Sequence, residues 1–278
     1  MLSYSIQMQW RMIWERKIAT IILFLLFCLI LVNYFNNVMT YKGTDIVDMY
    51  HPMKLLTLSN YSEFCFYLLQ YYPLLVVIPA GFSLFADKRF NQYIFIQSRV
   101  GARNYYLGKI IAVFLVNFTV FTIPFLVEIL LNCIAFPLAA TGDPSNLGYY
   151  NETYIEITNT YLFSSLYNQS PYLYAVFFTL VFGVFSGMLA TFTIAISTFP
   201  IKYKVLLFLP VYLLLHGVGM LKQIVPSITF ETNYFYNLGF YYPVQNATDS
   251  LIAFLSFIVL LLCLSLFIVI YRMRKDAL

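Results

Sequence analysis

Long runs of apolar residues, separated by short polar connections, extend along most of this chain. Six of the runs approach the roughly 20 residues that a helix needs to cross about 30 Å of hydrocarbon. The pattern predicts six transmembrane helices, at residues 18–35, 64–85, 110–136, 172–199, 205–220 and 251–271. Prolines inside these runs, which remove backbone donors, predict local kinks; they include Pro73 and Pro79 in the second run.

Composition agrees with this pattern and narrows the class of protein. Of the 278 residues, 61% are hydrophobic and 10% are charged, far outside the range of soluble domains. We therefore predict an all-α integral membrane protein with a single transmembrane domain over residues 1–278. The four cysteines fall within apolar runs and lack metal-ligand spacing, so no metal site is predicted.

Basic residues are distributed unevenly among the connections. Thirteen of the 16 Lys and Arg residues fall in the N-terminal segment, the second and fourth connections and the tail, and three fall on the opposite side. Because cytoplasmic loops carry the excess of Lys and Arg, both termini are predicted to be cytoplasmic. The net charge of +4 is explained by this topology, and no polybasic cluster indicates nucleic-acid binding.

Residues 1–17 form a polar but amphipathic segment before the first crossing. Ile6, Trp10, Ile13 and Trp14 follow the spacing of one helix face. We expect a helix in the membrane interface, with Trp10 and Trp14 as anchors at headgroup depth. Anchoring alone would explain this helix without any further function.

The connection 86–109 is longer and more apolar than a turn between two crossings requires. It carries five basic residues, and Phe90, Tyr93 and Ile94 share a face at helical spacing. An apolar stripe on a short surface helix must be buried in lipid or in a partner, and the sequence leaves both possibilities open.

The same connection contains a Gly-Lys pair, Gly108–Lys109, that invites comparison with a phosphate-binding loop. Such a loop needs Gly, four residues, and then Gly-Lys-Ser/Thr. Six residues separate Gly101 from Gly108, and Ile110 follows Lys109. The chain is therefore predicted to have no ATPase site of its own.

Several of these features occur together in one known family. The features are the N-terminal interface helix, six crossings, the ending "SRVGARNYYLGK" of the basic connection, the long segment after the fifth crossing and the basic tail "YRMRKDAL". Taken together, they resemble the permease subunit of bacterial ABC-2-type ABC transporters. The family's pattern is matched at Ser98, Arg99, Arg103, Tyr105, Tyr106 and Lys109. The chain departs from it at Phe90 and Asn91, where the family has a small residue after the acid.

The resemblance implies a type V exporter-like architecture in a bacterial plasma membrane, and a coupling role for the connection 86–109. In that family this loop docks on separate ABC ATPase subunits, which bind ATP and Mg²⁺. The chain itself would need no cofactor, and would pair with a second permease copy or a homologous permease. Its coupling residues would be Asp87, Lys88, Arg89, Phe90, Tyr93, Ile94, Ser98, Arg99 and Arg103.

The segment 221–250 follows a short fifth crossing and is rich in aromatic residues. The resemblance implies short re-entrant helices in the outer leaflet here. An aromatic belt at the outer interface explains the same composition, because tyrosine is suited to the boundary between water and lipid.

Polar groups within the predicted crossings are candidates for a substrate pathway, because uncompensated charge in hydrocarbon is costly. Glu128 is the only acid inside a run. The other polar candidates within the runs are Asn117, Asn132, Gln70 and His216. A hydrogen-bonded structural role for Glu128 is the alternative. Gly183 and Gly187, four residues apart, predict close helix packing, either within the chain or between chains.

The function that these observations favour is export of an amphipathic or hydrophobic substrate, such as an antimicrobial peptide, a drug or a lipid-like molecule. Catalysis is disfavoured because neither paired acids nor a Ser/His or metal cluster is evident. A secondary transporter, which usually has several intramembrane ion-binding groups, is one alternative. A non-transporting membrane sensor or immunity protein is another.

Overall fold

The computed structural model describes residues 2–46, 49–138 and 160–276, and most of these residues are helical. The α-helices are α1 Leu2–Glu15, α2 Ile18–Thr40, α3 Glu63–Leu75, α4 Ser83–Arg89, α5 Gln92–Val100, α6 Ala102–Ala135, α8 Ser164–Gln169, α9 Pro171–Ser197, α10 Phe208–Ile224, α11 Tyr234–Leu238 and α12 Ala247–Asp276. Two short 3₁₀ helices are η2 Pro52–Leu55 and η3 Lys204–Leu207.

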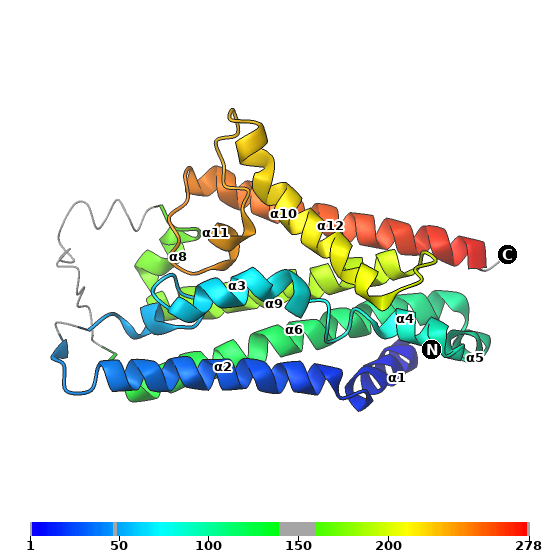
Figure 1. The fold of residues 1–278 in the computed structure, drawn as a ribbon, viewed down its shortest axis with the longest axis horizontal. Coiled ribbons are helices and arrows are strands. Elements are labelled where there is room, and N and C mark those ends of the chain that lie inside the picture. The colour runs from blue at the N-terminus through cyan, green and yellow to red at the C-terminus, as the bar shows by residue number, and fades with distance from the viewer. Residues whose placement is uncertain (1, 47–48, 139–159, 277–278) are drawn as a thin grey trace.

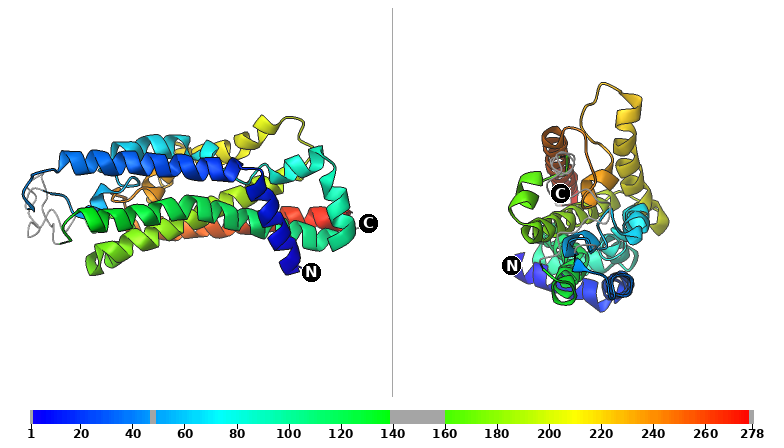
Figure 2. Two further views of the ribbon diagram at one scale, coloured as in Figure 1. Left: turned by 90° about the horizontal axis from the view of Figure 1, so that it is seen from below. Right: turned by 90° about the vertical axis from the view of Figure 1, so that its left-hand side faces the viewer.

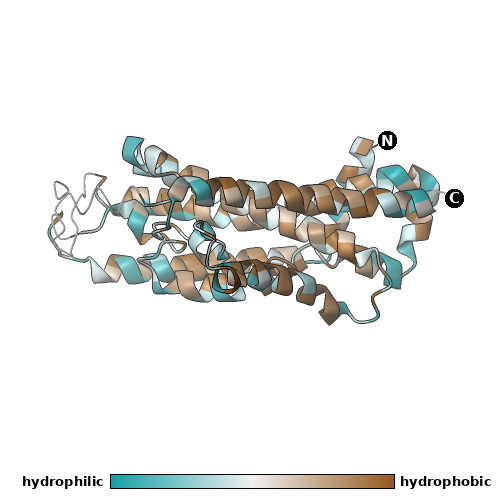
Figure 3. Cartoon of the chain, turned by 90° about the horizontal axis from the view of Figure 1, so that it is seen from above, coloured by the Kyte–Doolittle hydropathy of each residue, from teal (hydrophilic) through white to brown (hydrophobic). Residues whose placement is uncertain are grey.

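The long helices lie along one axis, and both ends of the chain are at the same end of the bundle (Figure 1). From that end α2 and α6 run away, and α9 and α12 return toward it (Figure 1). Apolar residues dominate the middle of the bundle, and hydrophilic residues gather toward its ends (Figure 3). This arrangement is typical of a bundle that crosses a membrane along its long axis.

Five stretches of the described chain are long and apolar enough to cross a membrane: Ile18–Thr40, Ala102–Ala135, Pro171–Ser197, Lys204–Ile224 and Ala247–Arg274. They correspond to the first, third, fourth, fifth and sixth predicted crossings. The protein is therefore an all-helical, multi-pass membrane protein.

The second predicted crossing, 64–85, is not one continuous helix. Helix α3 has 13 residues, and irregular turns separate it from α4. Pro79 lies in these turns and has no backbone N–H to continue a helix. The Asn117 side-chain amide donates to the Val76 carbonyl and so satisfies a backbone group near the break. Together α3 and α4 return toward the end with both termini (Figure 1).

Helices α6 and α9 pack closely because α9 has glycines where the two helices meet. A Cβ at Gly183 would overlap the Thr122 hydroxyl, and one at Gly187 would lie 2.6 Å from the Phe114 ring. Both contacts are within the chain. Beside them, the buried Tyr72 hydroxyl lies 2.9 Å from Ser186 Oγ and connects α3 to α9.

Helix α1 crosses the end of the bundle at an angle to the long helices (Figure 2). Its Ser5 and Gln9 side chains are buried, and Ser5 Oγ donates to the Asn104 carbonyl of α6 at 2.9 Å. Trp10 and Trp14 are half-buried, with ring centroids 5.9 Å apart. The predicted amphipathic helix is present, and part of its surface is buried against α6.

The segment 221–250 turns back on the loop before α3. Backbone hydrogen bonds join Phe240 to Leu58 at 2.8 Å and to Asn60 at 2.9 Å. The Tyr241 ring is buried among Tyr61, Tyr161, Tyr167 and Tyr174. These contacts form at the end of the bundle opposite the termini, where α8 and α11 lie (Figure 1).

Candidate functional site

Helix α5 lies at the end of the bundle that carries both termini (Figure 1), and apolar and basic side chains on it and beside it are exposed. Phe90, Ile94 and Phe95 are 67%, 51% and 70% exposed. Arg89, Ser98, Arg99 and Arg103 are exposed around them, whereas Tyr93 is half-buried and packs against the core. We name the exposed set Arg89, Phe90, Ile94, Phe95, Arg99 and Arg103 the α5 surface.

Two left-handed backbone positions frame α5. Asn91 has φ 55° between α4 and α5, and Gly101 has φ 82° between α5 and α6. Asparagine and glycine tolerate this conformation better than other residues. Each of them changes the chain direction without a long loop, so α5 stays in contact with α4 and α6.

A buried ion cluster fixes the base of this surface. Asp87 is fully buried, and its Oδ2 accepts from the Lys109 ammonium at 2.6 Å and from the Tyr105 hydroxyl at 2.7 Å. Its Oδ1 accepts from Arg16 at 2.7 Å. Lys109 is also fully buried and donates to Gln9 at 2.7 Å. The cluster therefore joins α4 to α6, to α1 and to the connection before α2.

The pKa of Asp87 lies below its ordinary value. Burial alone would raise this pKa, but the Lys109 charge and the hydrogen bonds from Lys109, Tyr105 and Arg16 outweigh burial. Asp87 is thus an internal anion at neutral pH, and its carboxylate is occupied by groups of the same chain.

Lys88 has a similar internal role at the end of α9. Its ammonium donates to the Ser197 and Thr198 carbonyls at 2.9 and 2.8 Å. The last carbonyls of a helix carry partial negative charge and lack helical partners, so a cation is favourable there. Lys88 thereby joins α4 to α9.

The structure thus divides the nine residues predicted to couple to an ATPase. Asp87 and Lys88 hold α4 inside the fold, and Tyr93 packs inward. Six others are exposed, namely Arg89, Phe90, Ile94, Ser98, Arg99 and Arg103. Phe95 is the most exposed apolar residue of α5, and sequence reasoning did not select it, although it follows Ile94 directly.

Glu128 lies fully within the core of the bundle and holds the 3₁₀ segment η2 and the residues that follow. Its Oε1 accepts from Asn33 Nδ2 at 2.9 Å, from Thr57 N at 2.7 Å and from Thr57 Oγ1 at 2.6 Å. Asn132, one helical turn away, donates to the Pro52 carbonyl at 3.2 Å. These contacts anchor the loop between α2 and α3 to α6.

The other polar residues proposed for a substrate pathway lie apart from Glu128. Asn117 donates to Val76 near the break after α3. Gln70 is exposed on α3. His216 is on α10, where its ring stacks on Tyr212 with centroids 4.0 Å apart. The five candidates therefore do not form a single polar cluster.

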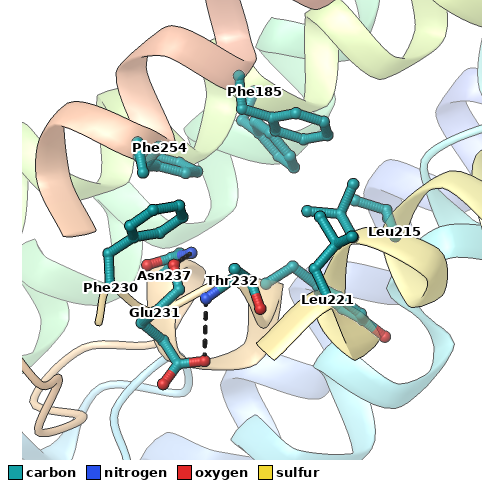
Figure 4. Close-up of a pocket in the computed structure, with 12 residues that line it drawn as sticks. Phe185, Leu215, Leu221, Phe230, Glu231, Thr232, Asn237 and Phe254 are labelled. Carbon is teal, nitrogen blue, oxygen red and sulfur yellow. Dashed lines mark hydrogen bonds between the residues drawn. The ribbon is translucent and has the colours of Figure 1, made fainter. Parts of the chain in front are cut away.

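A small apolar pocket of about 70 Å³ lies among α9, α10, α12 and the segment before α11 (Figure 4). Phe185, Leu215 and Phe254 are among its walls. Its acid, Glu231, accepts from the backbone N–H groups of Thr232 and Asn233 at 3.1 and 3.0 Å. The acid of the pocket is thus held by its own chain, and most of the remaining lining is apolar.

Among residues 2–46, 49–138 and 160–276, no group of three His, Cys, Asp or Glu side chains lies close enough together to bind a metal ion.

His51 begins η2 and provides a test of pH dependence. Burial and the nearby Lys54 charge lower the pKa of His51 to about 4, and its Nδ1 accepts from the Met53 N–H at 3.2 Å. The neutral ring stabilises the fold above the ordinary histidine pKa of about 6.5, and this contribution is lost as the pH falls from there toward 4.

We expect His51→Asn, which can still cap η2, to reduce the loss of thermal stability between pH 7 and pH 5. The Tm of both proteins in detergent at each pH measures this, and equal losses would contradict it.

No family model, no curated protein and no solved structure matches this chain. The class of protein that the fold defines is a multi-pass helical membrane protein with an exposed α5 surface at one end, next to a buried ion cluster.

Proposed function

We propose that this protein is the permease subunit of an ATP-driven ABC-2-type exporter in a bacterial plasma membrane. It would form the membrane pathway for an amphipathic or hydrophobic substrate, together with a second permease. Separate ABC ATPase subunits would bind ATP and Mg²⁺ and dock on the α5 surface at the cytoplasmic side. The sixth crossing of this architecture would be the broken segment 64–85.

The observation that carries the proposal is an exposed apolar and basic surface on a rigid base. Phe90, Ile94 and Phe95 are large, exposed apolar groups, and they lie at an end of the bundle where hydrophilic residues gather (Figure 3). An apolar patch with a charged rim is typical of a protein interaction site. A partner protein would bury these rings and pair with the arginines around them.

The base of the surface explains how a docked motor would act on the membrane helices. Asp87 and Lys109 connect α4 to α6, which has 34 residues and is about 51 Å long at 1.5 Å per residue. Lys88 connects the same short helix to α9. A force on α5 would therefore reach two long helices through buried contacts, and mechanical coupling needs such connections.

The test is association with an ATPase in the membranes of the source organism. The tagged chain should retain, after cross-linking, a protein with the nucleotide-binding motifs of an ABC ATPase. We expect Arg99→Glu combined with Arg103→Glu to reduce that association at least tenfold, because both charges lie on the α5 surface.

The control is Arg11→Glu combined with Lys17→Glu, which makes the same charge change at exposed positions outside the α5 surface. Both variants should insert into the membrane in normal amounts. Recovery of no ATPase with the unaltered chain would refute the proposal, and so would equal association of both variants.

A further inference from the structure

A basic cleft of about 1020 Å³ lies beside the α5 surface, between the end of α9, α4 and the connection before α10. Five basic residues line it, and its described lining contains no Asp or Glu; the basic residues are Lys88, Arg89, Lys202, Lys204 and Arg272. Tyr106, Phe199 and Tyr203 add aromatic walls. Such a wall composition is suited to a ligand with one anionic part and one apolar part.

The fold brings these cations to one cleft, and it holds two of them by groups of the same chain. Lys88 donates to the end of α9, and the Lys204 ammonium lies 4.3 Å from the centroid of the Phe82 ring. Arg89, Lys202 and Lys204 are exposed. Like charges around one cleft repel one another, and an anion bound there would lower that energy.

The position of the cleft relative to the lipid indicates what kind of anion it takes. Lys204 begins the membrane-crossing stretch Lys204–Ile224, which places it at headgroup depth. Val205 and Leu209, which follow, are 73% and 52% exposed. A cationic cleft thus adjoins an apolar, lipid-facing helix, as a phospholipid requires of its binding site.

We propose that this cleft binds the phosphate of an anionic phospholipid, whose acyl chains lie along the exposed face of α10. Basic pockets between membrane helices on the cytoplasmic side are known to hold acidic headgroups. A soluble phosphate has no acyl chains to contact the neighbouring apolar surface, and an acidic protein segment could bind the cations without contacting that surface. The cleft shares Arg89 with the α5 surface, whereas the other five residues of that surface lie outside its described lining, so the inference does not rest on a docked ATPase.

The experiment is native mass spectrometry of the full chain in detergent, with equal amounts of dioleoylphosphatidylglycerol and dioleoylphosphatidylcholine. We expect the chain to retain the anionic lipid at least tenfold more than the zwitterionic one. Arg89→Gln, Lys202→Gln and Lys204→Gln together should reduce that preference at least fivefold. Lys202→Gln alone, at an exposed position, should reduce it about twofold and guards against misfolding of the triple variant.

The matched control combines Arg11→Gln, Lys17→Gln and Arg99→Gln, which removes three charges at the same end outside the cleft. It should keep the full preference. An equal loss in both triple variants would show unspecific attraction to a basic surface and overturn the proposal. Displacement of the lipid by millimolar inorganic phosphate or glycerol 3-phosphate would identify a soluble phosphate as the ligand and overturn the proposal. The absence of a preference for the anionic lipid in the unaltered chain would also overturn it.

Discussion

Replacing Asp87 with alanine is expected to lower the free energy of unfolding by about 3–5 kcal/mol, because the Lys109 ammonium would remain buried without its carboxylate. Lys109 has no exposed surface and cannot turn to water without moving α6 or α1. Arg16, which is 26% exposed, can turn to solvent and adds less to the loss. Unfolding by titration with sodium dodecyl sulfate in mixed micelles measures the difference.

Removing both charges separates the two causes of this effect. The double variant Asp87→Leu with Lys109→Met contains neither the carboxylate nor the buried ammonium. We expect it to regain at least half of the stability that Asp87→Ala loses. Glu15→Ala, at an exposed acid of α1, should change stability by less than about 0.5 kcal/mol. An Asp87→Ala protein within 1 kcal/mol of the unaltered chain would contradict the role of the ion cluster.

The ion cluster also predicts the response to acid. Because the pKa of Asp87 is lowered in the folded chain, its contribution to stability is fully present above the ordinary aspartate pKa of about 3.9. The contribution is lost only as the pH falls through the lower pKa of the folded protein. The connection of α4 to α6 through Asp87 should therefore persist throughout the neutral and mildly acidic range.

Replacing Glu128 with alanine is the second large effect that we expect, with a loss of at least about 3 kcal/mol. Three hydrogen bonds to Oε1 would be lost, and each buried donor left without a partner costs roughly 1–3 kcal/mol. The Thr57 N–H and hydroxyl are two of those donors, so the loop after η2 would be released. Hydrogen exchange of peptides covering residues 52–62 should rise together with the loss of stability.

Glu128→Gln distinguishes a structural role from a role in transport. Glutamine keeps an acceptor oxygen at the Oε1 position, so we expect stability within about 1 kcal/mol of the unaltered chain and unchanged exchange of residues 52–62. Gln70→Ala, at an exposed position of α3, serves as the control for removing a polar side chain. If Glu128→Gln released the loop as alanine does, the hydrogen-bond account of this residue would be wrong.

The division of the predicted coupling residues shows where sequence reasoning stops. The connection 86–109 was singled out by its length, its basic residues and its apolar content, and the structure places a separate helix there. Which residues face outward was not evident, because Asp87 and Lys88 are as hydrophilic as Arg89. Only their partners on α1, α6 and α9 distinguish an internal carboxylate from an exposed one.

The pattern of hydropathy by itself determined that the chain is helical, crosses a membrane several times and begins with an amphipathic helix. The apolar content and periodicity of each run can be read from that run alone, without knowledge of its neighbours in space. Five crossings follow from such runs as single helical stretches. The tertiary structure decided that the run at 64–85 is broken, with Asn117 satisfying a carbonyl beside the break. It also decided that Asp87 meets Lys109 and that Glu128 meets Thr57. The pairing of polar groups depends on how separate helices pack against one another. That packing cannot be read from the order of residues along any one helix.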